Sequence, residues 1–366
     1  MKEFRDPHPD LPAPSTSVGL LGWLRGNLFS SVGNSLLTIF ACYIIYLLIV
    51  PAFDWALLNA DWVGETRNDC TSGGACWVFV GARFDQFMYG FYPESEYWRI
   101  NLAFGLLAVL LILLNIKQIP KKGWLGAGTL VLYPIVAFYL FSGGVLGLDV
   151  VETSKWGGLS LTLVLSGVGI VASLPIGIML ALGRRSEMPI VRAVCVVFIE
   201  FWRGVPLITV LFMSSVMLPL FLPEGTTFDK LLRAMIGIVL FESAYMAEVV
   251  RGGLAAIPKG QFEAAKALGL KYWQSMSLII LPQALKLVIP GIVNTFIALF
   301  KDTTLVLIIG LFDLLTTVEA GFKDSNWLGY ALEGYAFAAL VYWVFCFSMS
   351  RYSQRLERKL QTGHAR

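Results

Sequence analysis

Residues 263–282 read EAAKALGLKYWQSMSLIILP and form a polar stretch between hydrophobic segments. Pro258, which precedes the stretch, lacks a backbone N–H and therefore suits the start of a helix. Gly269 suits the left-handed residue that follows a helix end. The pattern predicts a short helix over 258–268 with a sharp stop.

A second short helix is expected over 271–280, closed by Pro282 because proline cannot continue a helix. Glu263 and Lys266 lie beside apolar residues of the first helix, so the hairpin suits insertion into a groove on a partner protein. A DNA-binding helix-turn-helix and a plain connector between membrane spans are the alternatives. Residues 258–282 contain no arginine and only three lysines, Lys259, Lys266 and Lys271, which disfavours DNA binding.

The composition indicates a membrane protein. Hydrophobic residues make up 57% of 366 positions, charged residues only 14%, and the mean hydropathy is +0.70. An ordinary soluble domain has about 25% charged residues. The chain is therefore predicted to be an all-α polytopic membrane protein. Both histidines, His8 and His364, lie near the ends and no Cys-x-x-Cys pair occurs, so neither histidine catalysis nor a metal site is expected.

The hydropathy pattern predicts the membrane topology. A hydrocarbon core of about 30 Å needs roughly 20 apolar helical residues, and about eight segments are long enough. They are 29–50, 100–116, 124–140, 159–182, 205–222, 234–250, 287–307 and 328–347. Because basic residues of short loops favour the cytoplasm, the loops with Lys117, Lys121 and Lys122 and with Arg184 and Arg185 are placed there.

This orientation places both ends of the chain in the cytoplasm. Residues 1–27 are expected to form a polar cytoplasmic tail and residues 351–366 a basic one. The acidic loop 54–97 then faces the periplasm. It contains Cys70 and Cys76, which an oxidising compartment can join, so they are a disulfide candidate, with two free thiols as the alternative.

The organisation of the chain changes near residue 150. The three spans in 28–150 carry almost no charge and are expected to form an accessory region. The region 151–350 carries an ordered set of polar and small residues. A stripe of small residues recurs every four positions in 159–182, which lets a neighbouring helix approach closely. Its members are Gly169, Ser173, Gly177 and Ala181.

Residues 200–207 read EFWRGVPL at the predicted entry of the fifth span. Glu200 and Arg203 are three positions apart, so they share a helix face and can form an ion pair. Such a pair can anchor the helix at the membrane interface or contact a substrate.

Glu242 lies deeper, in the sixth predicted span. A carboxylate at that depth normally faces a bundle interior, a partner or water, so Glu242 is a candidate for the substrate pathway. Glu248 and Arg251, near the cytoplasmic end of the same span, are expected to pair and to support the hairpin.

The seventh predicted span is the most irregular. Asn294 and Thr295 place hydrogen-bonding groups inside it, and Lys301, Asp302 and Thr303 interrupt it. Broken helices in transporters bring free backbone groups and half-helix ends to a substrate near the midplane. Extension of the Lys301 side chain to lipid headgroups is the alternative interpretation.

The polar stretch resembles the EAA signature of ATP-binding-cassette (ABC) importer permeases. Its elements are Glu263, Ala264, Ala265, Gly269, Ile279, Leu281 and Pro282. From about residue 156 to 351 the chain resembles the polar amino-acid family of these permeases, with a type I core of about five helices. Its EAA coupling loop, 251–286, lies between the third and fourth of them. The three extra N-terminal helices resemble the M-type permease subunit of general L-amino-acid transport systems.

The resemblance implies a transport subunit rather than an enzyme. It would move polar or general L-amino acids from a periplasmic binding protein across a bacterial inner membrane. No G-x-x-x-x-G-K-[ST] phosphate loop occurs, so ATP and Mg would bind to two partner ATPase subunits and no cofactor to this chain. A second related permease would complete a heterodimer surrounded by membrane lipid, and no nucleic-acid partner is implied.

An amino-acid zwitterion needs an acceptor for its ammonium group and a donor for its carboxylate. Asp302 or Glu242 are the candidate acceptors, and Lys301, Arg203 or a half-helix N-terminus the candidate donors. An ion-coupled secondary transporter or channel is the alternative function. It would need no EAA hairpin and would usually show an internal repeat.

Overall fold

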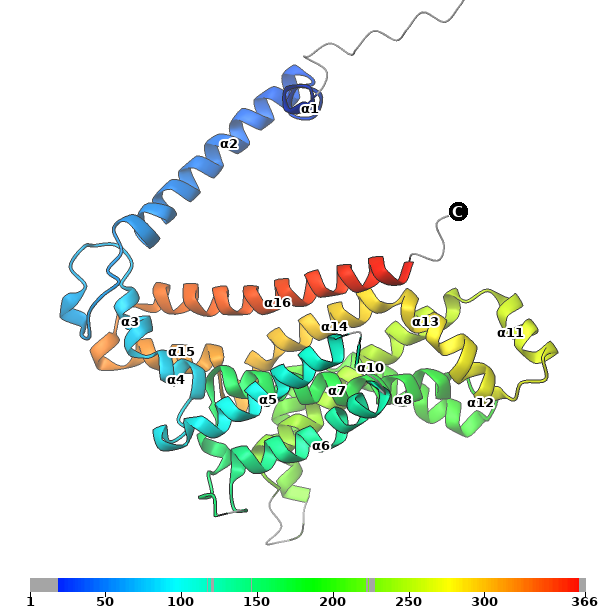
Figure 1. Cartoon of the computed structure of the whole chain (residues 1–366). Helices are drawn as coiled ribbons and strands as arrows, with labels where there is room; N and C mark the ends of the chain where they lie inside the picture. The colour runs from blue at the N-terminus through cyan, green and yellow to red at the C-terminus, as the bar shows by residue number, and fades with distance from the viewer. Residues whose placement is uncertain are drawn as a thin grey trace, which may run out of the picture. The chain divides into compact units, whose positions relative to one another are not determined.

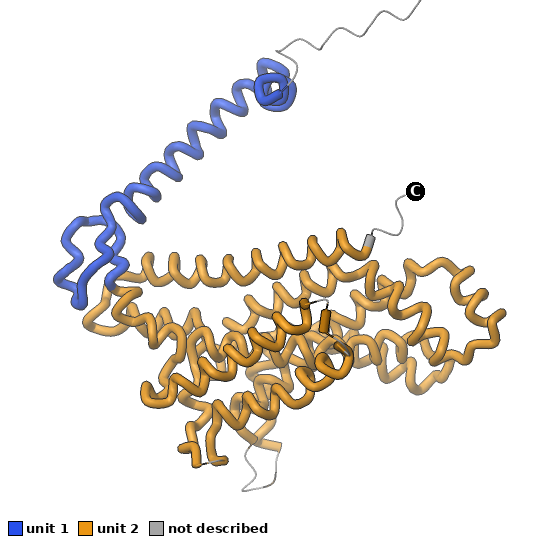
Figure 2. The backbone as a smooth tube through the Cα atoms, viewed as in Figure 1, with its two compact units in different colours: residues 1–78 blue, residues 79–366 orange. Residues whose placement is uncertain are grey.

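The structure, a computed structural model, describes residues 19–361 except 117, 120–121, 146, 222 and 224–227. Most of the predicted N-terminal tail, the end of the C-terminal tail, Lys117 and Lys121 lie outside these residues. The chain divides into two compact units, Met1–Val78 and Phe79–Arg366 (Figure 2).

Unit 1 is built around one long apolar helix. After α1 (Gly19–Asn27), the side chain of Ser31 accepts a hydrogen bond from the Asn34 amide and so caps α2 (Val32–Phe53). A π-helical turn, Asp54–Leu58, continues α2, and a short 3-10 turn, Arg67–Asp69, follows in the loop. None of the residues of α2 is buried.

Unit 2 is a helical bundle (Figure 1). Helix α3 (Trp77–Ala82) crosses the boundary between the two units. The next helices of unit 2 are α4 (Phe84–Tyr89), α5 (Tyr97–Asn115), α6 (Lys122–Ser142), α7 (Gly158–Arg184), α8 (Pro189–Gly204) and α9 (Leu207–Phe212). They are followed by α10 (Lys230–Ala256), α11 (Lys259–Ala267), α12 (Tyr272–Ser275), α13 (Leu281–Leu287), α14 (Ile289–Asp302), α15 (Leu314–Lys323) and α16 (Ala331–Gln361). The two-residue strand β1 (Phe312–Asp313) bridges to Gly157 and Gly158.

The helix pair α7 and α10 forms the centre of unit 2 and makes the most extensive contact between any two elements. The predicted small-residue stripe on α7 is buried at all four positions, so its role in close packing is confirmed. A Cβ atom added to Gly177 would lie 2.7 Å from the Cβ of Met246 on α10. Only glycine fits at this position without moving α10.

The structure contains six helices long and apolar enough to cross a membrane, or seven if α8 and the helical segment after it count as one bent span. These numbers refer to the described residues. The predicted count of eight is therefore not confirmed. The sixth predicted span, 234–250, lies within α10, whose charged side chains, Glu242 and Glu248 among them, keep it outside this group.

The fifth predicted span, 205–222, corresponds to the helical segment Leu207–Phe221, and a sharp bend separates this segment from α8. Helix α8 ends at Gly204, and the next helical segment, Leu207–Phe221, leaves at an angle of 102°. Val205 is extended, with φ −111° and ψ 134°, because the ring of Pro206 disfavours a helical residue before it. The second segment is itself irregular, since α9 passes into a π-helical turn, Met213–Met217.

Candidate functional site

The predicted first helix of the EAA hairpin is present as α11, with Pro258 as the residue before it. Gly269 has a φ of +72°, as its position after the helix end predicts. The amide of Leu270 donates to the Ala265 carbonyl at 3.2 Å, and the amide of Gly269 donates to the Lys266 carbonyl at 3.0 Å. This pair of hydrogen bonds is the Schellman motif, which fixes the direction of the chain as it leaves α11.

The prediction that Pro282 closes the second helix is wrong. Helix α12 continues through a π-helical turn, Met276–Ile280, into α13, which contains Pro282 in its first turn. Proline is tolerated there because a first-turn residue does not need its N–H, and the wider π turn precedes it. The helical segment therefore runs from the hairpin to Leu287.

The hairpin exposes a mixed apolar and charged surface. Glu263, Ala264, Lys266 and Pro282 are exposed, whereas Ala265 is buried. Four large apolar side chains are also exposed on the hairpin: Leu268 (75%), Tyr272 (50%), Trp273 (68%) and Leu278 (69%). Exposed aromatic and aliphatic side chains of this kind, bordered by charges, are typical of a protein-binding surface.

An ion-pair network joins the helices that lead into the hairpin. Glu248 on α10 is its centre: one carboxylate oxygen lies 2.7 Å from Arg184 Nη1, and the other lies 2.9 Å from Arg251 Nη2. Arg203 Nη1 lies 3.7 Å from the same carboxylate. The predicted pairing of Glu248 with Arg251 is confirmed.

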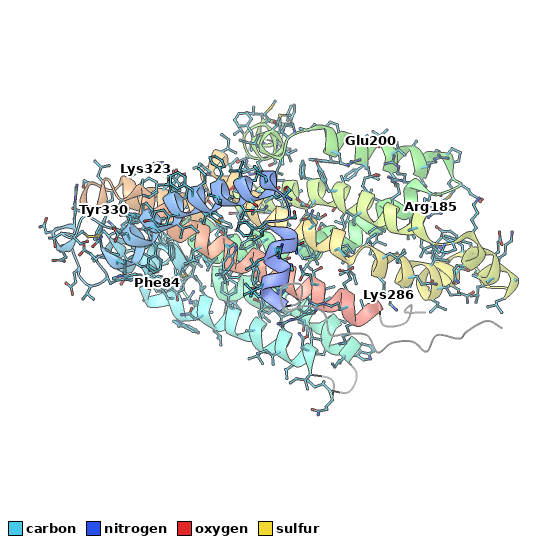
Figure 3. The ribbon with its side chains drawn as sticks, turned by 90° about the horizontal axis from the view of Figure 1, so that it is seen from above. Phe84, Arg185, Glu200, Lys286, Lys323 and Tyr330 are labelled. Carbon is cyan, nitrogen blue, oxygen red and sulfur yellow. A yellow bond between two sulfur atoms is a disulfide. The ribbon has the colours of Figure 1, made fainter. Side chains whose placement is uncertain are left out.

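The predicted pair between Glu200 and Arg203 does not form. Glu200 pairs instead with Arg184, at 3.0 Å, and Arg203 lies beside Glu248 and 5.7 Å from the centre of the Tyr245 ring. Helix α7 brings a guanidinium group from outside the motif close to Glu200, and α10 presents a carboxylate to Arg203. In Figure 3, Arg185 and Glu200 lie at one end of unit 2, and Phe84, Lys323 and Tyr330 lie at the opposite end.

Glu242 lies within α10, and only 3% of its surface is exposed. In the described part of the chain it forms no hydrogen bond or ion pair. Asp302, at the end of α14, is near enough for the two carboxylates to interact. The fold therefore brings together two acidic candidates from the sixth and seventh predicted spans.

The remaining candidates lie along α14 and the 3-10 segment Thr303–Ile309 that follows it. Asn294 and Lys301 are exposed, whereas Thr303 is fully buried. The hydroxyls of Thr295 and Thr303 donate to the carbonyls of Gly291 and Phe300 on their own helix. The helix type changes at Thr303, within the stretch predicted to be interrupted.

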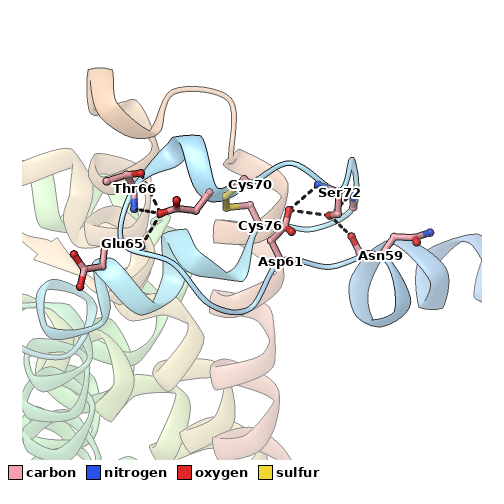
Figure 4. The surroundings of a disulfide bond; sticks show 9 residues. Asn59, Asp61, Glu65, Thr66, Cys70, Ser72 and Cys76 are labelled. Carbon is pink, nitrogen blue, oxygen red and sulfur yellow. Dashed lines mark hydrogen bonds between the residues drawn. A yellow bond between two sulfur atoms is a disulfide. The ribbon is translucent and has the colours of Figure 1, made fainter.

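Cys70 and Cys76 form a disulfide in the loop of unit 1 (Figure 4). The carboxylate of Asp61 accepts hydrogen bonds from the Ser72 amide at 3.1 Å and the Ser72 hydroxyl at 2.8 Å. These bonds lower the pKa of Asp61. The carboxylate of Asp69 accepts from the amides of Glu65 and Thr66, each at 2.9 Å. The acidic residues of this loop thus hold its backbone.

Sequence reasoning missed Asp313, which is fully buried at the junction of β1 and α15. It caps α15 by accepting from the amides of Leu315 and Thr316, and it accepts from the Tyr342 hydroxyl at 3.0 Å. Burial raises the pKa of Asp313, and the hydrogen bonds oppose that shift. An aspartate followed three residues later by threonine at the start of an apolar run was a capping signal that could have identified it.

Comparisons with known proteins identify the family of this chain. A family model described as binding-protein-dependent transport system inner membrane component matches residues 173–362. The inner membrane amino-acid ABC transporter permease protein YhdY of Escherichia coli is 60% identical over 356 residues, 97% of this chain and 97% of that protein. The glutamate/glutamine/aspartate/asparagine transport system permease protein BztC of Rhodobacter capsulatus is 42% identical over 96% of each chain.

A solved structure of an amino acid ABC transporter with histidines is 29% identical to this chain, with a TM-score of 0.49. The similarity covers 55% of this chain and 92% of that chain. The family model spans more than half of the present sequence, and the Escherichia coli relative matches nearly all of it. This chain therefore belongs to the family of binding-protein-dependent transport system inner membrane components.

Proposed function

We propose that this chain is the permease subunit of an ATP-driven importer that carries amino acids from a periplasmic binding protein into the cytoplasm. The observation that carries the proposal is 60% identity over 97% of the chain with an inner membrane amino-acid ABC transporter permease. Family membership makes the chain a multi-pass inner membrane transport component rather than an enzyme. Polar L-amino acids are the proposed substrate class, because a second relative is named for glutamate, glutamine, aspartate and asparagine.

The proposed complex contains two ATPase subunits, which bind ATP and Mg, and a second related permease that forms a heterodimer with this chain. Both termini are cytoplasmic in this proposal, and residues 28–150 are an accessory region beside a permease core over 151–350. A Bacillus subtilis relative, the probable amino-acid ABC transporter permease protein YckA, supports a separate core. It is 34% identical over 55% of this chain but over 87% of its own length.

The coupling loop 251–286 is the proposed docking element for an ATPase subunit. The exposed residues Leu268 and Trp273 supply apolar contact, and Glu263 and Lys266 supply charged contact, on a hairpin whose turn is fixed by Gly269. ATP-driven closure of the two ATPases would bring the two coupling hairpins together. The permease would then shift from inward-facing to outward-facing because ATP binds more tightly to the complex in that state.

Glu242 and Asp302 are the proposed acceptors for the substrate ammonium group. Their support is the burial of Glu242 and the proximity of the two carboxylates, since a cation would offset their mutual repulsion. Lys301, which is exposed at the end of α14, is the proposed donor to the substrate carboxylate. Arg203 is the weaker candidate because it already lies beside Glu248.

Reconstitution into vesicles tests the proposed function. The purified complex of both permeases and the ATPase, supplied with the binding protein, is expected to accumulate radiolabelled amino acid only when ATP is present on the ATPase side. Uptake driven by an ion gradient alone, without the ATPase, would instead establish the secondary transporter and overturn the importer proposal.

A matched pair of substitutions at Gly269 tests the coupling role. Gly269→Val is expected to reduce ATP-driven uptake strongly, since a β-branched residue at φ +72° costs about 1–2 kcal/mol of local conformational energy. Gly269→Asn is the control, because asparagine tolerates the left-handed conformation. A Cβ at this position would contact nothing within 4 Å. Equal uptake by both variants would contradict the coupling role.

A further inference from the structure

The ion-pair network around Glu248 lies between the coupling hairpin and the ends of three helices. Its arginines come from different elements: Arg184 ends α7, Arg203 lies near the end of α8, and Arg251 is one turn further along α10. Glu248 contacts all three of them. One carboxylate of α10 therefore contacts the ends of both α7 and α8.

A second contact continues from the network to the hairpin. Arg185, the residue after Arg184, has its guanidinium carbon 5.6 Å from the centre of the Phe262 ring on α11. The two consecutive arginines thus join the end of α7 both to Glu248 and to the coupling helix. A cation above an aromatic face at this distance is attracted by the ring.

Apolar packing makes the same region one body. A single hydrophobic cluster contains Ala181 and Leu182 of α7, Ile199 of α8 and Val250 of α10. The same cluster includes Met276 and Ile280 of the hairpin, and Phe262 packs against it. Because packed side chains transmit displacement, motion of the hairpin must reach the ends of α7, α8 and α10 together.

The ion-pair network carries a net positive charge. Glu248 and Glu200 face three arginines, and the Glu248 side chain is only 16% exposed. Without Glu248, the three guanidinium groups would repel one another, and Arg184 would keep only the exposed Glu200. The arrangement of the helix ends therefore depends on this single carboxylate more than on any one arginine.

We propose that Glu248 is a positioning residue through which displacement of the coupling hairpin is transmitted to the cytoplasmic ends of α7 and α8. The proposal rests on the proposed import function and identifies the contacts inside this subunit that link ATP use to opening of the substrate pathway. Glu248 touches neither substrate nor nucleotide in this mechanism. Its loss should separate ATP hydrolysis from transport.

The test measures amino acid transported per ATP hydrolysed in vesicles that contain the full complex and the binding protein. For Glu248→Gln, this ratio is expected to fall about tenfold, the change that a difference of about 1.4 kcal/mol produces. Glu319→Gln is the matched control, because Glu319 pairs with Lys323 on its own helix, at 2.8 Å, and lies outside the network. The control should retain the wild-type ratio.

A purely structural role would lower hydrolysis and transport in proportion, through loss of assembled complex, and would leave the ratio unchanged. A wild-type ratio of transport to hydrolysis in Glu248→Gln therefore overturns the proposal. Glu248→Asp provides a second measurement if the glutamine variant does not assemble. It keeps the charge but shortens the side chain, so an intermediate ratio is expected, and an unchanged ratio again overturns the proposal.

The two proposals fail in different ways. If the wild-type complex accumulates no amino acid with ATP, the import function fails. If the wild-type complex transports and both Glu248 variants keep its ratio of transport to hydrolysis, only the role of Glu248 fails.

Discussion

Helices α2 and α7 have nearly the same apolar character but different surroundings. The most apolar windows of their spans have mean hydropathies of 2.5 and 2.3, respectively. No residue of α2 is buried, whereas α7 buries many, from Gly158 to Leu182. Since lipid tails are as apolar as leucine, hydropathy places both helices in the membrane, and within unit 2 the small residues at regular spacing on α7 let α10 approach it closely.

The largest expected effect is that of enlarging the stripe on α7. Gly177→Leu should lower the free energy of unfolding of the detergent-solubilised chain by about 3 kcal/mol, because the new side chain must displace the Met246 side chain and the backbone of α10. Thermal unfolding of the purified chain measures this loss. The same substitution in α2, Gly33→Leu, is the control, since a Cβ there meets only the Ser31 hydroxyl, at 3.9 Å. An equal loss of unfolding free energy in both variants would contradict the role of the small-residue stripe in packing α7.

A smaller effect is expected from the disulfide in the loop after α2. Replacing Cys70 and Cys76 by alanine should destabilise that loop by about 2 kcal/mol, because the bond closes a short segment and so restricts the unfolded chain. Amide hydrogen exchange measures the effect, with faster exchange expected in the loop and unchanged exchange in α7. Cys42→Ala, which removes a free cysteine of α2, is the control. Faster amide exchange in α7 as well would contradict the expectation that the disulfide stabilises only the loop.

The smallest expected effect is a difference in pH dependence between the two regions. Burial raises the pKa of Asp313, which lies against the start of α7, so its contribution is most favourable at low pH and is lost as pH rises through its folded pKa. Hydrogen bonds from Ser72 lower the pKa of Asp61, so its contribution is present at neutral pH and is lost as pH falls through its folded pKa.

Unfolding measured between about pH 3 and pH 7 in Asp313→Asn and Asp61→Asn should therefore show opposite pH trends relative to wild type. The same sign for both variants would contradict the environments described for these two carboxylates. Ser72→Ala removes the hydroxyl donor but keeps the Ser72 amide, so it should reduce the trend assigned to Asp61 without abolishing it and leave that of Asp313 unchanged.

Local signals in the sequence predicted α11, the left-handed Gly269 and the buried stripe on α7. The predicted start of the fifth span, at residue 205, lies at the bend before Pro206. The partners of Glu200 and Arg203 could not be predicted from their motif. They depend on Arg184 and Glu248, which precede and follow the motif in the sequence and approach it only after α7, α8 and α10 pack.

The sequence by itself determined that the chain spans a membrane and carries a hairpin with a fixed turn, because segment length, hydropathy and the conformational range of glycine and proline act over a few neighbouring residues. Only the tertiary structure decided which charges on different helices meet and that Asp313 is buried. Burial and ion pairing depend on helices that are distant in the sequence, so Glu248 became the centre of three arginines, and Asp313 became a buried cap, only when those helices came together.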